Sequence, residues 1–577
     1  MRPNPLKLTD APKIYQHDQD KVMTPEQTIA RFKQRLTDTG LKILDDIVRI
    51  DKGRLEIPVY FSVCGPEARA AIGNYKQMGK GATPAQSQAS AVMELGERFS
   101  LFSFYQNSDN FIDAPLSAIH EPTIAFEAIA RSVDDCSNDL PVIRPFFNQL
   151  PLRWTWAHNL TQGTQVLVPF NWFWAINQFN GSSAGNCIEE ALCQGICEVV
   201  ERHVSALICS DRIKVPLIEP ESVTDPVALE LMAKYKKAGI QLRLSDFTLD
   251  MGIPSIGAIA WDPATFPKKS EIVWTAGTMP SAAKALCRAL TEVAQLAGDF
   301  NSGSNYEASG LPKFASLEAA EYVLQPGYSV DMGKLPSLSN DNIKIEVENC
   351  IAALAARKME VFTVDVRHPR LDIPAFYTII PGAQFRERTA RPSVGLICSK
   401  IITETLPPAQ AQKRLLQFNQ LLPGKYYIHF YLGQLQMNQG DYEAALASLR
   451  TAADLEPGAE DLASIYTYLG LCHKEAGRYG EALTWLDKAD KVDPERTDTL
   501  NLMGFCHFKG KAYEQAIHCF SRVIALNPSS AIDHANIAVN YRALGQAAKA
   551  VEYYQLALSL NPTIDFAREH LAQMGIG

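Results

Sequence analysis

The sequence predicts a mixed α/β domain followed by an all-α repeat solenoid. The first 400 residues alternate short β-like runs with longer helical patterns, which is typical of mixed α/β folds. The last quarter instead repeats with a period near 34 residues, which is typical of stacked helical hairpins. We therefore expect a first domain over 1–402, a linker over 403–422 and about four repeats over 423–577.

The β-like runs are short, rich in β-branched and aromatic residues, and separated by helical patterns. They are 55–63, 165–170, 272–276, 361–366 and 375–380.

Composition narrows the class of protein. The chain has 577 residues with 46% hydrophobic and 21% charged content, typical of a globular protein. A net charge of −9 argues against direct binding of nucleic acid or an anionic membrane. There is no membrane-length apolar run and no apolar leader, so we expect a cytoplasmic protein. Twelve cysteines without a CxxC pair favour reduced core residues over disulfides or a zinc site.

Three residue types recur at matched positions in the last quarter, at intervals of 37, 34 and 34 residues. The alanines are Ala445, Ala482, Ala516 and Ala550. The prolines are Pro457, Pro494, Pro528 and Pro562. The small residues, twelve before the alanines, are Gly433, Gly470, Gly504 and Ala538. Small residues let two helices approach closely and proline ends each unit, so the array resembles the tetratricopeptide repeat. The longer first interval indicates three extra residues near 458–461.

An unusual acidic pattern occurs twice, at 94–98 and at 198–202, as Glu-x-x-Glu-Arg. Residues three apart share a helix face, so each copy directs two carboxylates the same way. On a solvated surface such a pattern would be ordinary. The second copy, however, lies in a mostly apolar helix pattern over 191–209. Buried unpaired carboxylates cost several kcal/mol each, so we expect a cationic partner.

Three helices each carry one polar stripe with carboxylates. Thr83 with Pro84, and Asn186, are the expected starts of the first two helices. The stripes are Ser87, Ser90, Glu94 and Glu97; Glu190, Gln194, Glu198 and Glu201; and Arg288, Glu292 and Gln295. If the stripes converge, Mg²⁺ is the natural counter-charge, and arginines are available for phosphate oxygens. There is no Walker loop, and 79–81 (Gly-Lys-Gly) is expected to be a turn.

Together these motifs resemble the signatures of the YcaO family, over roughly residues 20–400. They are 79–83 with Ser90-x3-Glu94-x2-Glu97-Arg98, Asn186-x3-Glu190-x7-Glu198-x2-Glu201-Arg202, and Arg288-x3-Glu292 with Gln295.

The resemblance implies ATP binding with Mg²⁺ by a fold that lacks a Walker loop. The implied metal-facing residues are Glu94, Glu97, Glu190, Glu198, Glu201 and Glu292. The implied nucleotide-binding residues are Lys21, Thr28, Ser90, Glu94, Asn186, Arg202 and Arg288. The sequence reveals no general base; His203 follows the second motif, and packing inside the helix is its expected role.

The implied activity is ATP-dependent activation of a peptide amide by O-phosphorylation, giving an azoline or a thioamide. A YcaO domain followed by tetratricopeptide repeats is similar to a branch described as supporting methylthiolation of a ribosomal protein. The implied partners are a peptide or protein substrate, with a ribosomal protein as one candidate, a partner enzyme in the repeat groove, and a second copy in a homodimer. The alternative is an adaptor that binds ATP without catalysis while its repeats tether a partner enzyme.

Overall fold

The computed structural model describes most of the chain, and contacts between its residues divide it into two compact units. The described residues are 3–267, 270–301, 314–385 and 392–575. The first unit consists of Met1–Cys136, Asn148–Ser304 and Ser309–Arg388. The second unit, called the repeat unit below, consists mainly of Thr389–Gly577 and includes Ser137–Phe147.

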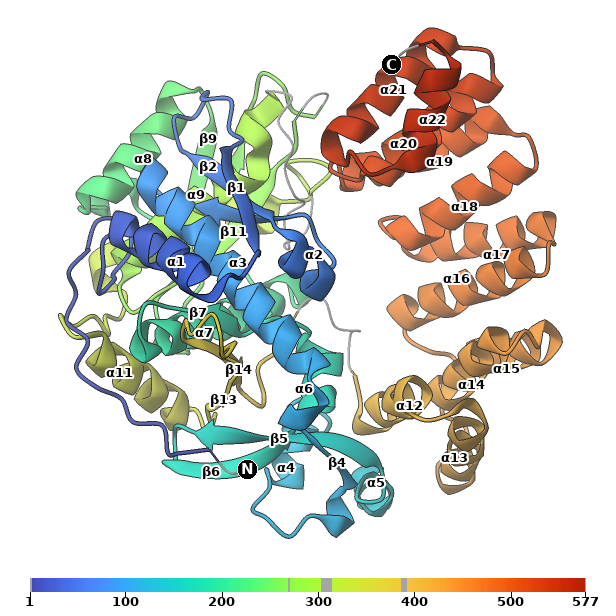
Figure 1. Ribbon diagram of the computed structural model, residues 1–577, viewed down its shortest axis with the longest axis horizontal. Helices are drawn as coiled ribbons and strands as arrows, with labels where there is room; N and C mark the ends of the chain where they lie inside the picture. Colours follow the sequence, from blue (N-terminus) through green and yellow to red (C-terminus); the bar gives the residue numbers. More distant parts are fainter. Residues whose placement is uncertain (1–2, 268–269, 302–313, 386–391, 576–577) are drawn as a thin grey trace. The chain divides into compact units, whose positions relative to one another are not determined.

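Three sheets form the frame of the first unit (Figure 1). The first has the order β1-β2-β3, with strands Leu44–Arg49, Val59–Cys64 and Lys76–Lys80. The second has the order β11-β10-β9-β8-β12, with strands Val273–Thr278, Ser255–Trp261, Gln241–Asp246, Leu217–Ile218 and Ser329–Val330. The third has the order β4-β5-β13-β14-β7, with strands Ile112–Pro115, Pro151–Asn159, Phe362–Asp365, Ala375–Ile379 and Ser182–Ala184, and β6 (Thr164–Pro169) pairs with β5. The described pairs are antiparallel except β8 with β12.

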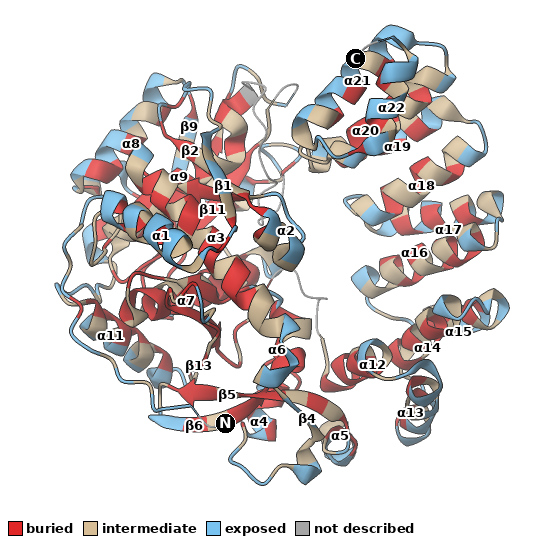
Figure 2. Cartoon of the chain, in the orientation of Figure 1, coloured by how far each residue is buried: buried red, intermediate tan, exposed pale blue. Residues whose placement is uncertain are grey.

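Helices cover these sheets, and the first unit is therefore mixed α/β, as expected. The α-helices are α1 Pro25–Thr39, α2 Pro66–Ile72, α3 Pro84–Gln106, α4 Phe126–Arg131, α6 Phe170–Asn177, α7 Ile188–Ser210, α8 Pro226–Lys237, α9 Ala282–Asn301, α10 Glu321–Leu324 and α11 Ile343–Ala356. The short 3₁₀ helices are Ser108–Asn110, Leu116–Ala118, Pro220–Ser222 and Met332–Lys334. Three long helices carry the acidic stripes: α3 packs on β3, α9 on β11, and α7 on β14. Figure 2 shows how much of α3 and α7 is buried.

The helix starts agree with the sequence in one case and differ in the other. Thr83 caps α3, and its hydroxyl accepts the Gln86 amide at 3.2 Å. The cap of α7 is Cys187, whereas Asn186 was expected. Asn186 uses its side chain differently: its Nδ2 donates to the carboxylate of Glu190 at 3.1 Å. Because the Asn186 side chain is bonded to Glu190, it does not cap the first turn of α7.

Each of the five predicted β-like runs contains a strand (β2, β6, β11, β13 and β14), although the first starts late. Leu55 and Ile57 were expected to open the strand over 55–63 but precede β2. Both are fully buried, so their apolar alternation reflects core packing before the strand begins.

The repeat unit is built from paired helices that match the predicted repeats. The pairs are α14 Tyr426–Asn438 with α15 Tyr442–Asp454, α16 Ala459–Glu475 with α17 Tyr479–Val492, α18 Thr497–Lys509 with α19 Tyr513–Leu526, and α20 Ala531–Ala543 with α21 Ala547–Leu560. The remaining helices are α5 Leu140–Phe147, α12 Val394–Thr405, α13 Pro408–Leu421 and α22 Asp565–Gln573. The four alanines are fully buried. A Cβ at Gly470 would lie 2.5 Å from Leu486, which explains the small residue there.

Two details extend the prediction. The extra residues expected near 458–461 lengthen α16 to 17 residues, against 13 in α14. The segment 403–422, expected to be a linker, contains α13, whose Leu415 and Phe418 are fully buried. Phe418 stacks on Phe146 of α5 at 4.2 Å between ring centroids.

Within the described residues, no helix has the length and apolar character needed to cross a bilayer.

Candidate functional site

A charged cluster lies where α3, α7, α9 and the end of β3 meet. Its members interact electrostatically with one another and are defined as Glu94, Glu97, Glu198, Glu201 and Glu292 with Lys80, Arg98, Arg202 and Arg288. The ion-paired side chains range from 3% exposed at Glu201 to 34% exposed at Glu94. Carboxylates from all three acidic stripes therefore lie in one cluster, which from the sequence could be stated only as a condition.

On one side of the cluster, ion pairs connect α7, α9 and β3. Arg288 Nε donates to Glu201 at 3.0 Å, and the same carboxylate oxygen accepts the backbone amide of Thr278 at 3.2 Å. Lys80 forms an ion pair with Glu292. The two pairs belong to one electrostatic group, because Arg288 also acts on Lys80 and Glu292.

On the other side of the cluster, Arg98 forms ion pairs with the two carboxylates of α3. Its guanidinium lies 3.3 Å from Glu97 and 3.8 Å from Glu94. Ser182 of β7 donates to Glu97 at 2.5 Å and accepts from Arg98 at 3.0 Å. The guanidinium also stacks over Phe179, 4.4 Å from the ring centroid. Arg98 is thereby fixed at this edge.

The cluster has five carboxylates for four basic groups, and the pKa shifts show where the balance is poorest. Burial raises the pKa of Glu97 to about 8, with Glu198 and Glu94 adding to the effect and Arg98 opposing it. Burial also raises the pKa of Glu198. For Glu292 the effect of burial is outweighed by the positive charges of Lys80, Arg288 and Arg202 together, and its pKa is lowered. A further cation near Glu97 and Glu198 would therefore be favourable.

Glu190 forms a second group, two helical turns before Glu198 and about 12 Å away along α7. Its carboxylate accepts the backbone amides of Val22 at 2.6 Å and Asn186 at 2.9 Å. Lys21 Nζ lies 4.0 Å from it. The N-terminal segment thus brings Lys21 to Glu190 on the acidic face of α7.

Three other residues singled out by the sequence have different surroundings. Thr28 is buried in α1, where its hydroxyl donates to the Thr24 carbonyl at 3.1 Å. Ser90 is half-buried, one turn before Glu94 on α3. His203 is buried, and its Nδ1 accepts the Gln384 amide at 3.0 Å, consistent with the packing role expected for it.

Two members of the cluster were not predicted as site residues. Lys80 was expected in a turn but is the last residue of β3. A Cβ at Gly79 would lie 2.2 Å from the Ala91 nitrogen, so glycine lets β3 pack directly on α3 and places Lys80 at the cluster. The signal available in the sequence was a lysine between two glycines. Arg98 belongs to the first acidic motif and follows Glu97 directly, but the motif assigns it no role of its own.

The residue types fit a magnesium nucleotide. Carboxylate oxygens are the ligands that Mg²⁺ takes, and lysine and arginine are suited to phosphate oxygens. Within the described ranges, no three His, Cys, Asp or Glu side chains are arranged to hold a metal ion. The carboxylates lie instead next to the basic side chains of the cluster.

Comparison with known families adds to this geometry. The model of the YcaO family, described as a cyclodehydratase that binds ATP and Mg²⁺, matches residues 78–384. Tetratricopeptide repeat models match 426–459 and 534–564, and the model of anaphase-promoting complex subunit 3 matches 455–523.

Among individual proteins, an uncharacterised protein of Methanothermobacter thermautotrophicus is 26% identical over 63% of this chain and 95% of its own length. The ribosomal protein S12 methylthiotransferase accessory factor YcaO of Escherichia coli is 24% identical over 62% of this chain and 64% of its own length.

Two solved structures share the fold of the first unit. YcaO from Methanopyrus kandleri bound with AMPPCP and Mg²⁺ has a TM-score of 0.52 and 22% identity, over 67% of this chain and 98% of that one. A heterocyclase in complex with substrate and cofactor has a TM-score of 0.53 and 22% identity, over 66% of this chain and 55% of that one. At this identity the likeness concerns the fold alone.

Proposed function

The chain belongs to the YcaO family, and on that premise we propose that its charged cluster binds ATP with Mg²⁺ to activate a backbone amide of a peptide or protein. The observation that carries the proposal is the convergence of five carboxylates and four basic side chains from α3, α7, α9 and β3.

The proposed roles are those that the resemblance to the YcaO family implies for each position. The metal-facing residues are Glu94, Glu97, Glu190, Glu198, Glu201 and Glu292. The nucleotide-facing residues are Lys21, Ser90, Glu94, Asn186, Arg202 and Arg288. Thr28, whose hydroxyl donates to the Thr24 carbonyl, is proposed with them on the family resemblance alone. Lys80 and Arg98 are internal counter-ions that hold the carboxylates in place until a dication takes over part of that task. Burial raises the pKa values of Glu97 and Glu198 despite the arginines beside them, and a further positive charge would offset that effect, which supports this division.

The chemical difficulty lies in the amide, whose oxygen is a poor leaving group. Bound magnesium ATP supplies the phosphoryl group that turns this oxygen into a good one. The protein contributes orientation: Arg288 is held by Glu201 at 3.0 Å, so its guanidinium is fixed before any phosphate oxygen arrives. The low exposure of the cluster strengthens each of these charge interactions. Whether the product is an azoline or a thioamide depends on the nucleophile.

We propose that the repeats recruit the substrate or a partner enzyme, since stacked helical repeats form extended binding surfaces. A ribosomal protein is one candidate because the relative from Escherichia coli is an accessory factor of ribosomal protein S12 methylthiotransferase. We also propose that the protein forms a homodimer and is located in the cytoplasm.

The test compares Glu201→Gln with Glu230→Gln, an exposed glutamate that pairs with Lys234 at 2.9 Å on α8. Phosphate release by the full chain is measured with and without candidate peptides, together with binding of a fluorescent ATP analogue. We expect Glu201→Gln to lose about 10²-fold or more in phosphate release, as removal of one electrostatic group from an active site does. Glu230→Gln should not change it.

Phosphate release that is unaffected by Glu201→Gln would contradict catalysis at this site. Binding of nucleotide without peptide-dependent release would favour the adaptor, in which the first unit binds ATP and the repeats tether an enzyme.

A further inference from the structure

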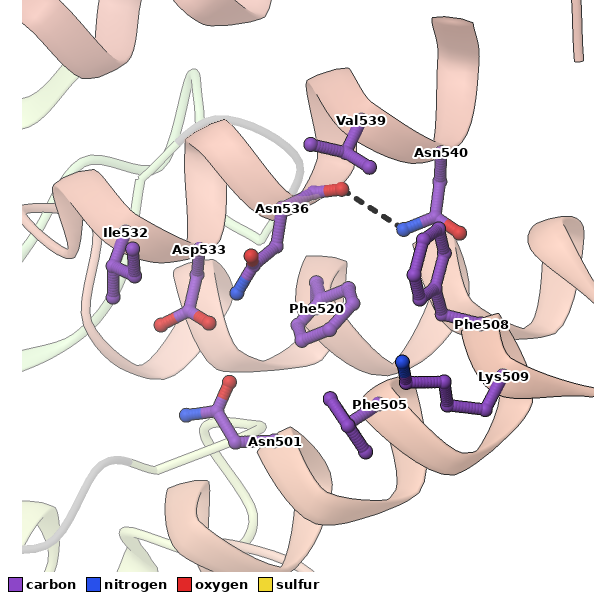
Figure 3. A pocket seen from close by; sticks show the side chains of 10 residues that line it. All are labelled: Asn501, Phe505, Phe508, Lys509, Phe520, Ile532, Asp533, Asn536, Val539 and Asn540. Carbon is purple, nitrogen blue, oxygen red and sulfur yellow. Dashed lines mark hydrogen bonds between the residues drawn. The ribbon is translucent and has the colours of Figure 1, made fainter. Parts of the chain in front are cut away.

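A pocket of about 400 Å³ opens between α18, α19 and α20 of the repeat unit (Figure 3). Phe505, Phe508 and Phe520 form its apolar lining. Asp533 and Asn540 present polar groups to it from α20. Its volume is in the range of ligand pockets, and its residues belong to the repeats and not to the charged cluster.

The polar groups of the pocket are buried and incompletely satisfied. Asp533 is 1% exposed, and its Oδ2 accepts from Ser530 at 2.5 Å. Its Oδ1 makes no hydrogen bond of ordinary geometry within the described chain, although the amide side chains of Asn536 and Asn501 lie near enough to lower the pKa of the carboxyl group, which burial raises. Asn540 is also 1% exposed; its Nδ2 donates to the Asn536 carbonyl at 2.8 Å, and its Oδ1 has no hydrogen bond in the same described set. Buried polar atoms normally find a partner, so two open acceptors at one pocket point to a ligand that donates hydrogen bonds.

The lining holds one carboxylate, Asp533, and one ammonium, Lys509, beside three aromatic rings. A carboxylate is matched by a positive group, and the faces of aromatic rings attract cations. The exposed Lys509 already lies over the Phe505 ring, with Nζ 5.3 Å from its centroid. Residues 423–577 carry 13 Lys and Arg against 18 Asp and Glu, a net charge of −5 that attracts basic partners.

We propose that this pocket binds an arginine side chain of an extended polypeptide, with its guanidinium donating to Asp533 and Asn540. A guanidinium is planar and has five donors, so one group reaches two acceptors, which the smaller ammonium of lysine does less well. The proposal rests on the recruiting role proposed for the repeats and names the chemistry that they recognise.

The test uses the full chain without nucleotide and three peptides, Ac-Gly-Ser-X-Ser-Gly-NH₂ with X as arginine, glutamine or glutamate. Ligand-observed NMR titration gives the dissociation constants at constant ionic strength. We expect the arginine peptide to bind at least tenfold more tightly than the other two. Equal binding of the arginine and glutamine peptides overturns the proposal, and this comparison needs no variant.

A variant pair locates the site. Asp533→Asn keeps an acceptor for Ser530 but removes the charge, and should reduce the arginine preference to threefold or less. Glu514→Gln removes one exposed charge from α19, outside the pocket, and should leave the preference unchanged. An intact preference in a folded Asp533→Asn protein overturns the assignment. The peptide titration contains no ATP, and the Glu201→Gln protein should bind the arginine peptide as the unmodified chain does. A negative result in this titration therefore counts against the arginine pocket and not against the proposed nucleotide function.

Discussion

At the scale of single residues, Lys13 is a cation with little access to water. Its amino group lies 2.8 Å from Asp20 and 2.7 Å from Glu346, and all three side chains are less than 10% exposed. Burial alone would lower the pKa of Lys13, but hydrogen bonds to Asp20 and Glu346 outweigh it and raise the pKa. This triad fastens the N-terminal segment to α11, and the same segment brings Lys21 to Glu190.

We expect Lys13→Met to destabilise the folded protein by about 3–5 kcal/mol, because it leaves two buried carboxylates facing each other without a cation. Urea unfolding at neutral pH measures the change. Lys344→Met is the matched control: Lys344 also joins the N-terminal segment to α11, through Asp10 at 3.7 Å, but Lys344 is only half-buried and Asp10 is exposed. Its loss should cost about 0–1 kcal/mol.

The cost of Lys13→Met should also depend on pH. Burial raises the pKa of Glu346 even with Lys13 present, so its ionised form costs stability at neutral pH and protonation relieves that cost. Removing Lys13 raises this pKa further. The difference between the two proteins should therefore be largest near neutral pH and shrink as the pH falls through the pKa of Glu346. A difference that grows on acidification would contradict the argument.

At the scale of elements, the contact between β3 and α3 sets the position of the charged cluster. Ser87 of α3 donates to the Gly79 carbonyl at 2.9 Å, and Ser62 of β2 donates to the Ala91 carbonyl at 2.8 Å. A Cβ at Gly79 would meet backbone atoms at 2.2 Å, and backbone cannot move aside as a flexible side chain can. Lys80 reaches Glu292 only if this close packing is kept.

We therefore expect Gly79→Ala to lower stability by about 1–3 kcal/mol or more, as overpacking does, and to weaken nucleotide binding by displacing Lys80. Thermal unfolding and binding of a fluorescent ATP analogue are the measurements. Gly480→Ala is the control, because no atom lies within 4 Å of the added Cβ and the site is helical. Alanine there should be neutral or stabilising by up to about 1 kcal/mol. Unchanged nucleotide binding in Gly79→Ala would show that Lys80 is not positioned by this contact.

Elements with a strong internal period were predictable from the sequence, and their pairing in space was not. The repeats were found because Gly470 and Ala482 recur in step, and the stripes of α3 and α7 because i,i+3 spacing defines a helix face. Sheet order depends on long-range pairs such as Phe362 with Asn159, for which no local signal exists. The ion pair of Lys80 with Glu292 was unpredictable for the same reason, because 212 residues separate its partners in the sequence.

At the scale of the whole molecule, the two units carry binding sites of different chemistry. The first unit concentrates buried carboxylates and basic groups in its charged cluster, whereas the repeat unit offers an aromatic pocket with Asp533. A ligand stabilises the state that binds it, by about 2.7 kcal/mol at a concentration of 100 Kd. Each ligand should therefore protect the elements that it contacts.

Hydrogen exchange measured by mass spectrometry on the full chain can locate that protection. With Mg²⁺ and a non-hydrolysable ATP analogue, we expect slower amide exchange in α3, α7 and α9, because ion-paired side chains on these helices gain a shared ligand. Exchange in α14–α21 should change little, since no side chain of the charged cluster lies there. Glu201→Gln should reduce the protection. Slower exchange in the repeats without any change in α3, α7 and α9 would contradict the assignment of the nucleotide to the charged cluster.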